Sequence, residues 1–294
     1  MDRISVRDAT ALVRTKEQTG RRYMLLENYF YSQDVMTAFN MARDGAFGQL
    51  TQAEGAYIHD CRSLAFEKDG SLTWRGRRKS RMAGNIYPTH ALGPVAKILG
   101  INAGDRLTSL VSMQSAPVCL HEYAVKKFGP DSQAARQKFT NGDMSVPLIA
   151  TEKGRHLTIH YDSSSPRPAS NFVLVQGSRG VFDQRNGAYL DGVGAEHYWA
   201  KMEKYGEKYG ARLWKEHGAA ARATQHAGGD YFTLREFLCM VSEKREPFID
   251  VYDAVSWSSL IPLSAESVRG KGSSVYIPDF TSGAWKDESR RPGL

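Results

Sequence analysis

The sequence predicts an α+β fold in which a short helix–strand–helix segment precedes an open, mostly antiparallel sheet with flanking helices. Three observations lead to this prediction. Residues 5–46 have the pattern of a helix, a short strand and a helix, residues 48–184 contain successive strand patterns, and the last third is helical. A chain of 294 residues accommodates one large domain or two. We place the boundary at Gly45, giving units 1–46 and 47–294.

The opening segment predicts a helix over residues 5–19, where apolar residues recur at helical spacing until Gly20. Residues 22–26 predict a short strand, because the run Tyr23-Met24-Leu25-Leu26 has no polar alternation, which is typical of a strand buried on both faces of a parallel sheet. Residues 33–43 predict a second helix. Because one parallel strand cannot form a stable sheet, we expect this segment to be the end of a larger α/β domain. No Gly-x-Gly-x-x-Gly turn of a dinucleotide-binding domain occurs after a strand in this sequence.

The middle of the chain predicts one sheet, and the last third predicts helices. The expected strands are residues 49–59, 106–113, 146–152, 156–161, 171–177 and 180–184, with helices at 94–99 and 118–128. Further helices are expected within 196–214, 231–243 and 250–261. Asp250 is a candidate N-cap, and Phe232, Phe237, Leu238 and Val241 share one face of the second of these helices.

Composition excludes several classes of protein. The apolar fraction of 41% supports a buried core, and no apolar run is long enough to cross a membrane. The net charge of +7 includes one basic cluster at residues 75–81, which we interpret as a solvated face because no nucleic-acid-binding motif accompanies it. Three widely spaced cysteines give neither a disulfide framework nor a zinc pattern, so no metal site is predicted. The first five residues contain no signal-peptide core, and localisation stays unknown.

The stretch from Gly84 to Pro94 places a phenol and an imidazole, Tyr87 and His90, in a turn before a predicted helix. The two groups suit acid–base chemistry, although a turn whose histidine only bonds backbone explains the pattern equally well. Glu27, Asn28 and Tyr29 follow the predicted strand 22–26, at the end where open α/β sheets bind ligands; a helix cap or turn is the alternative.

Six motifs occur in order along the chain and together carry a family resemblance. They are Leu26-Glu27-Asn28-Tyr29, Gly55-Ala56-Tyr57-Ile58-His59-Asp60, Trp74-Arg75, the stretch Gly84 to Pro94, Ser165-Pro166-Arg167-Pro168 and Asp250-Val251-Tyr252-Asp253-Ala254. The chain resembles glycoside hydrolase family 109, the NAD-dependent α-N-acetylgalactosaminidases of the Gfo/Idh/MocA superfamily. The resemblance implies a Rossmann domain followed by an α/β domain with an open, mostly antiparallel sheet. Residues 1–46 would then be a Rossmann remnant, with the main NAD-binding half absent from this chain.

The same resemblance implies a sugar site and its chemistry. NAD would serve as a recycled catalyst of oxidation, elimination, hydration and reduction of a carbohydrate substrate, an exception to paired-carboxylate hydrolysis. The implied catalytic residues are Glu27, Tyr57, Tyr87 and His90, with Asn28 as a cofactor contact and Arg75, Tyr57 and Tyr87 as substrate contacts. A homo-oligomer formed through the open sheet face is a further expectation, whereas nucleic-acid and membrane partners are not expected.

Several residues depart from the family pattern around the implied sugar site. Ala169 stands where the family usually has a tyrosine, Asn171 where it has an arginine and Arg78 where it commonly has a histidine. These departures leave the sugar specificity open. A sugar oxidoreductase of the wider superfamily and an inactive truncated remnant are the alternative functions. Relatives often carry an export signal at the N-terminal end.

Overall fold

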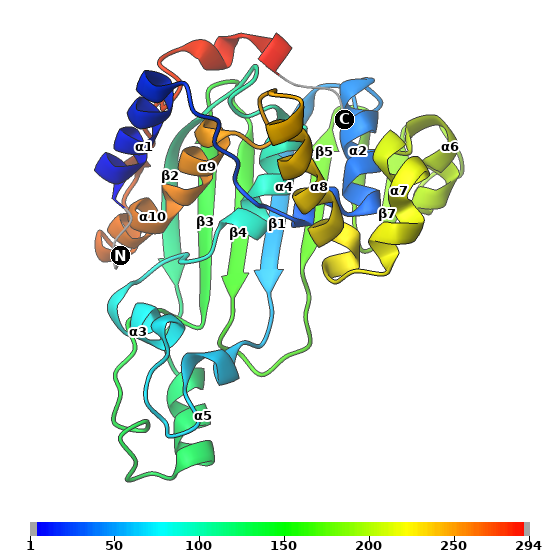
Figure 1. The fold of residues 1–294 in the computed structure, drawn as a ribbon. Helices are drawn as coiled ribbons and strands as arrows, with labels where there is room; N and C mark the ends of the chain where they lie inside the picture. The colour runs from blue at the N-terminus through cyan, green and yellow to red at the C-terminus, as the bar shows by residue number, and fades with distance from the viewer. Residues whose placement is uncertain (1–4, 291–294) are drawn as a thin grey trace.

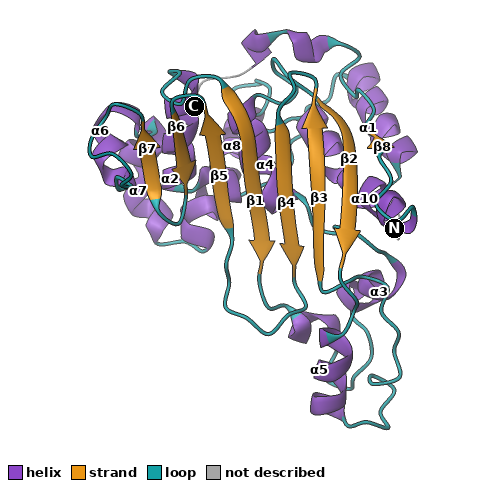
Figure 2. Ribbon diagram, turned by 180° about the vertical axis from the view of Figure 1, so that it is seen from behind, coloured by secondary structure: helices purple, strands orange, loops and turns teal. Residues whose placement is uncertain are grey.

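The computed structural model describes residues 5–290, and its centre is one eight-stranded sheet in the order β7-β6-β5-β1-β4-β3-β2-β8 (Figure 2). The strands are β1 (Leu50–Ile58), β2 (Leu107–Gln114), β3 (Met144–Thr151), β4 (His156–Asp162), β5 (Phe172–Gly177), β6 (Gly180–Asp183), β7 (Gly187–Leu190) and β8 (Val275–Tyr276). The six predicted strands of the middle region are confirmed within a few residues, whereas the short strands β7 and β8 were not predicted.

The sheet is mostly antiparallel, as the sequence predicts. Only β1 and β4 run parallel, and they are neighbours at its centre, with Tyr57 paired in register to Tyr161. Because neighbouring parallel strands end at the same edge of a sheet, the carboxyl ends of β1 and β4 lie side by side. This shared carboxyl edge faces a small lobe that contains α3 (Trp74–Arg81) and α5 (Cys119–Phe128) (Figure 1).

Helices cover one face of the sheet and leave the other face open (Figures 1 and 2). The covering layer contains α2 (Gln33–Arg43), α4 (Thr89–Leu99), α8 (Gly229–Ser242), α9 (Val251–Ser258) and α10 (Leu260–Arg269), with α1 (Val6–Thr19) packed on α9 and with α6 (Gly206–Tyr209) and α7 (Arg212–Arg222) at the β7 end. Met113, Leu148 and Tyr276 are exposed. The open face is therefore partly apolar, and oligomerisation through it stays a prediction.

Helix α4 lies directly on β1 because Gly55 has no side chain. A Cβ at Gly55 would overlap the carbonyl of Ala91 in α4. Ala91, Leu92 and Val95 are fully buried in the core between this helix and the sheet. The close approach fixes the first turn of α4 against the carboxyl half of β1, and thereby places His90 near Tyr57.

The predicted strand at residues 22–26 is wrong, since no strand or helix is assigned there. The apolar run has no neighbouring strand among residues 5–290, so its backbone donors find other partners. The Leu25 N–H donates to the carbonyl of Ile249, at 3.2 Å. Glu27 consequently precedes a short 3₁₀ helix, Tyr29–Tyr31, instead of ending a strand. The helices at both ends of the opening segment are confirmed, and the division at residue 46 stays a prediction.

Three helix predictions need correction. The helix expected at residues 94–99 begins at Thr89, so His90 lies in its first turn and Pro94 lies inside it. The helix expected over residues 250–261 is two helices that meet at Ser259, because Pro262 has no N–H to continue the hydrogen-bond ladder and suits a first turn. Of the four apolar residues predicted on one face of α8, Phe232 is buried, but Phe237, Leu238 and Val241 are exposed.

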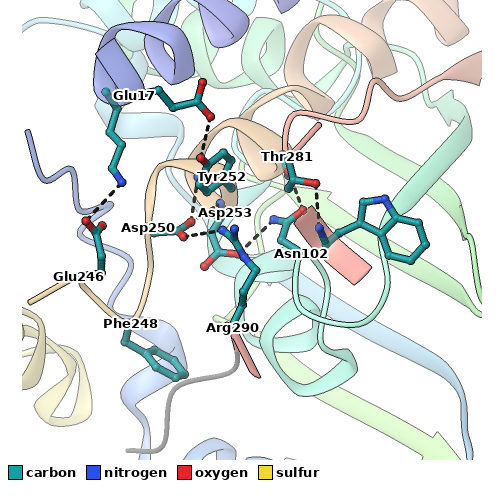
Figure 3. Close-up of polar contacts among 12 residues, drawn as sticks. Glu17, Asn102, Glu246, Phe248, Asp250, Tyr252, Asp253, Thr281 and Arg290 are labelled. Carbon is teal, nitrogen blue, oxygen red and sulfur yellow. Dashed lines mark hydrogen bonds and ion pairs between the residues drawn. The ribbon is translucent and has the colours of Figure 1, made fainter. Parts of the chain in front are cut away.

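A polar cluster joins α1, α9 and the C-terminal segment on the far side of the helical layer (Figure 3). Asp250 caps α9 by accepting hydrogen bonds from the backbone N–H groups of Tyr252 and Asp253, which confirms its predicted N-cap role. The Tyr252 hydroxyl donates to Glu17 of α1 at 2.8 Å, and the Arg290 guanidinium stacks on the Tyr252 ring at 4.7 Å. Burial, and then the charge of Asp253, raises the pKa of Asp250 to about 6.

Within residues 5–290, none of the helices combines the length and the apolar character that crossing a membrane requires. The N-terminal residues 1–4, on which the signal-peptide prediction partly depends, lie outside the described residues.

Candidate active site

The site is built around His90, which lies between a buried carboxylate and a phenol. Its Nδ1 is 2.8 Å from Glu27 Oε2 and 2.9 Å from Oε1, and its Nε2 is 3.1 Å from the Tyr87 hydroxyl. The backbone N–H of Tyr29 also donates to Glu27 Oε1, at 2.7 Å. A carboxylate only accepts hydrogen bonds, so Nδ1 carries a proton and Nε2 is the nitrogen that faces the phenol.

Glu27 is held by these contacts away from solvent, with 1% of its side chain exposed. The side chain of His90 is 16% exposed, and Tyr87 is 38% exposed, so accessibility increases along the chain of hydrogen bonds. This gradient gives a proton on Nε2 or on the phenol a route to a bound molecule, while Glu27 itself stays enclosed.

Aromatic rings fix the orientation of the imidazole. Tyr29 stacks on His90 with ring centroids 4.3 Å apart, and Tyr57 lies 5.4 Å from His90 and 5.1 Å from Tyr87. Asn171 secures this arrangement, because its amide donates to the Tyr29 hydroxyl at 2.7 Å and its carbonyl accepts from the Ile58 N–H at 2.7 Å. A ring held on two sides keeps the Nε2–phenol geometry that proton transfer requires.

All three phenols of the site remain protonated near neutral pH. Burial, and then the Glu27 charge, raises the pKa of both Tyr87 and Tyr29. Burial also raises the pKa of Tyr57 far above its ordinary value, with the nearby Cys61 thiol as the second cause. The phenols can therefore donate or relay protons near neutral pH.

A pocket opens beside this set at the carboxyl edge of the parallel strands, with about 560 Å³ of space that is partly open to solvent. Tyr57 and Tyr87 line it and His90 does not, and Tyr161, the register partner of Tyr57 on β4, also lines it. Arg75, Arg78 and Lys79 of α3 supply its polar wall. The hydroxyl-rich rim and the neighbouring acid–base group suit a small polyhydroxylated ligand.

The structure brings five of the six predicted site residues to this place: Glu27, Tyr57, Tyr87 and His90 converge, and Arg75 lines the adjoining pocket, stacked on Trp74 at 4.3 Å. Asn28 does not join the contacts around His90; its amide donates to Asp230 of α8 at 2.7 Å. The alternative in which His90 only bonds backbone does not fit its two side-chain partners. The catalytic and binding roles of these residues stay proposals.

Sequence reasoning missed three contributors: Asn171, Arg78 and Lys79. The basic run was interpreted as a solvated face, and this is wrong for Lys79, which is 4% exposed. In a helix, positions three or four apart share a face, so the spacing from Arg75 to Arg78 and Lys79 was the available signal. Asn171 and Arg78 were noted as departures from the family pattern without a structural role.

The three cysteines are free thiols, as predicted, and Cys61 is buried beside the pocket with His59 Nδ1 2.9 Å from its sulfur. Burial raises the pKa of the Cys61 thiol, which makes it a weak nucleophile. No group of three or more metal-binding side chains occurs in the part of the chain that the structure describes.

Solved structures of oxidoreductases have the same fold. An oxidoreductase domain protein from Kribbella flavida superposes with a TM-score of 0.64 over 93% of this chain and 71% of its own, at 16% identity. Levoglucosan dehydrogenase in complex with NADH and L-sorbose gives a TM-score of 0.66 over 94% of this chain and 71% of its own, also at 16% identity. This chain therefore shares the fold of these oxidoreductases.

Sequence comparison narrows this class to one family. The glycosyl hydrolase 109 C-terminal domain matches residues 31–287. A glycosyl hydrolase family 109 protein of Stenotrophomonas maltophilia is 34% identical over 98% of this chain and 67% of its own length. An α-N-acetylgalactosaminidase of Shewanella oneidensis is 38% identical over 96% of this chain and 63% of its own. This chain belongs to glycosyl hydrolase family 109, and it spans about two thirds of the length of these relatives.

Proposed function

We propose that this chain carries the sugar-binding and proton-transferring part of an NAD-dependent glycosidase that cleaves α-N-acetylgalactosaminides or a related glycoside. Family membership and the name of the Shewanella oneidensis relative support the glycosidase class and the substrate. The observation that carries the proposal is the position of His90, whose Nε2 meets Tyr87 while its Nδ1 is held by Glu27.

NAD, when bound, would reversibly remove hydride from the third carbon of the sugar, which makes the proton on the second carbon acidic. One observation fits its nicotinamide end: Asn28 Oδ1 is buried without a hydrogen-bond partner among the described residues, and it could accept from a carboxamide. We propose Asn28 for this contact. The described residues contain no glycine-rich strand-to-helix turn for the pyrophosphate, so they fit only this end of the cofactor.

The protein groups have separate tasks in this proposal. His90 Nε2 takes the proton of the third hydroxyl and later returns it. Glu27 holds the imidazole through Nδ1 and stabilises the positive charge that the proton creates. Because both Glu27 oxygens already accept hydrogen bonds, we assign it as a positioning residue and not as a sugar contact. The phenol of Tyr57 or Tyr87 would take the proton from the second carbon while it passes its own proton to the departing glycosidic oxygen, so that the phenol ends the step neutral.

Isotope exchange tests this chemistry. A chimera that joins the N-terminal segment of the Shewanella oneidensis relative to this chain is incubated with NAD and an aryl α-N-acetylgalactosaminide in heavy water. We expect deuterium on the second carbon of the released sugar, because that proton leaves and is replaced from solvent. Direct displacement never breaks this C–H bond. Hydrolysis without deuterium at the second carbon would contradict the proposal.

A sugar oxidoreductase is the second candidate, favoured by the dehydrogenase fold of the solved neighbours. The same incubation separates the two functions. A dehydrogenase accumulates one NADH for each oxidised sugar and leaves the glycosidic bond intact, whereas the glycosidase releases the aryl alcohol without net NADH.

A further inference from the structure

The pocket beside Tyr57 and Tyr87 contains three cationic side chains and no carboxylate. Arg75, Arg78 and Lys79 all line it, and its other lining residues are aromatic, aliphatic, thiol or hydroxyl groups. Arg75, Arg78 and Lys79 lie on one face of α3, because they are three and four positions apart. The wall is therefore positively charged.

Lys79 is buried at the base of this wall without an ionic partner. Its ammonium donates to the hydroxyls of Ser163 and Ser164, at 2.8 and 2.9 Å, and to the Tyr161 hydroxyl at 3.3 Å. These are neutral acceptors, and no ion pair of Lys79 occurs within residues 5–290. A buried charge is costly unless it is compensated, so this ammonium attracts a negative group into the pocket.

Arg78 adds a second uncompensated charge. Its side chain is half-buried between Tyr87 and Tyr161, and burial lowers the pKa of its guanidinium, although the group stays charged at neutral pH. The structure gives this side chain neither a hydrogen bond nor an ion pair within the described chain. Arg78 thus lines the pocket with guanidinium donors that have no hydrogen-bond partner among residues 5–290.

Carboxylates that neighbour the pocket lining in sequence are already engaged. Asp60 pairs with Arg62 at 3.0 and 2.8 Å, and Asp162 accepts from the N–H groups of Ser164 and Ser165 at 3.0 and 2.9 Å. Glu27 is held by His90 and does not line the pocket. None of them neutralises the wall formed by α3.

We propose that this pocket binds an oxyanion, a carboxylate or sulfate, carried by the sugar that the site processes. Arg78 offers a bidentate contact, and the exposed Arg75 supplies a second guanidinium. The buried ammonium of Lys79 contributes positive electrostatic potential without contacting the oxyanion. The inference names the substrate class of the proposed glycosidase site and rests on that function. An acidic or sulfated sugar replaces the plain N-acetylgalactosaminide as the preferred substrate.

Equilibrium binding tests the pocket without any turnover. Isothermal titration of residues 1–294 compares N-acetylgalactosamine, its 4-sulfate and 6-sulfate, and galacturonic acid in low-salt buffer. We expect at least one of the anionic sugars to bind about tenfold or more tightly than the neutral sugar, the scale of one charge-assisted contact. Equal affinities for all four, or no binding of any anionic sugar at millimolar concentration, would overturn the proposal.

Variants on the same helix locate the contact. Arg78→Gln and Arg75→Gln should each reduce the preference for the anionic sugar, and Arg78→Lys should retain part of it. Arg77→Gln is the matched control, since it removes one positive charge from α3 at an exposed residue outside the pocket lining. The proposal fails if Arg77→Gln weakens binding as much as Arg78→Gln does. Circular dichroism of each variant verifies that α3 remains folded.

Competition identifies the source of the oxyanion. Inorganic sulfate should compete weakly, because it lacks the sugar that fills the rest of the site, and NAD or ADP should not compete. Displacement of the anionic sugar by ADP would instead assign the cationic wall to a nucleotide phosphate and overturn the inference. Neither result depends on hydrolysis. If the four sugars bind equally, the deuterium test of the proposed function still stands. If no deuterium is incorporated, the binding preference for anionic sugars can still be measured.

Discussion

His90 Nδ1 lies 2.8 Å from Glu27 Oε2, although 63 positions separate the two residues in the chain. The carboxylate comes from the segment before the first 3₁₀ helix, and the imidazole comes from the first turn of α4. A buried acceptor fixed on Nδ1 leaves Nε2 to face Tyr87, and in the proposed mechanism it stabilises the imidazolium formed when Nε2 takes a proton. This contact defines the expected order of mutational effects.

Removal of the imidazole should affect turnover most. In the chimera with an N-terminal NAD-binding segment, His90→Ala should lower kcat by roughly a hundredfold or more, the scale of one positioned acid–base group. Tyr87→Phe should lower kcat by a smaller factor with little change in KM, since only the phenolic proton is lost. Glu27→Gln should likewise lower kcat by a smaller factor than His90→Ala, with little change in KM. A change confined to KM in these variants would instead indicate simple binding roles.

Gly55→Ala should destabilise the fold and increase the distance between Tyr57 and His90. The new Cβ would collide with the Ala91 carbonyl, so β1 and α4 must move apart, carrying Tyr57 away from His90. We expect a loss of roughly 1–3 kcal/mol in the free energy of unfolding, measured by urea denaturation. Gly206→Ala is the control, because the site of its Cβ is open and its backbone is helical. An unchanged midpoint for Gly55→Ala would contradict this packing.

Asp250 should make the protein less stable as pH rises from about 4 to 6. The folded-state pKa of about 6 exceeds the unfolded value of about 3.9, so the folded protein binds more protons in this window. Stability is then highest below the unfolded pKa and declines until Asp250 is ionised in both states. Asp250→Asn keeps an N-cap acceptor and should remove this part of the pH dependence. Urea midpoints between pH 4 and 7 measure the difference, and parallel curves for both proteins would disprove it.

The buried pair of Lys97 and Asp253 should show strong coupling. The ammonium lies 2.9 Å from Asp253 Oδ2, and both side chains are less than a tenth exposed. Lys97→Met leaves Asp253 without its buried cation and should cost about 3–5 kcal/mol, whereas adding Asp253→Leu should recover much of the loss. Lys208→Met, which breaks an exposed pair with Asp44, should leave the urea midpoint unchanged. Additive losses in the double variant would show that the pair is not coupled.

The sequence alone predicted the mostly antiparallel sheet, the two opening helices, the family and the main members of the site. Strand alternation, helix periodicity and the Tyr87–His90 stretch are local patterns, and each is visible within a few residues. Local pattern also produced the main error. The apolar run at residues 22–26 has the composition of a buried strand, but strand formation needs a neighbour to share its hydrogen bonds, and the described chain provides none there.

Only the tertiary structure decided which nitrogen of His90 faces Tyr87, that Glu27 is enclosed, and that Lys79 is buried beside the pocket and does not belong to a solvated face. Each of these facts depends on residues far apart in sequence. The contact between β1 and α4 through Gly55, and the parallel pairing that places Tyr57 beside Tyr161, bring those residues together. Burial and charge compensation arise from packing, so no local pattern in the chain specifies them.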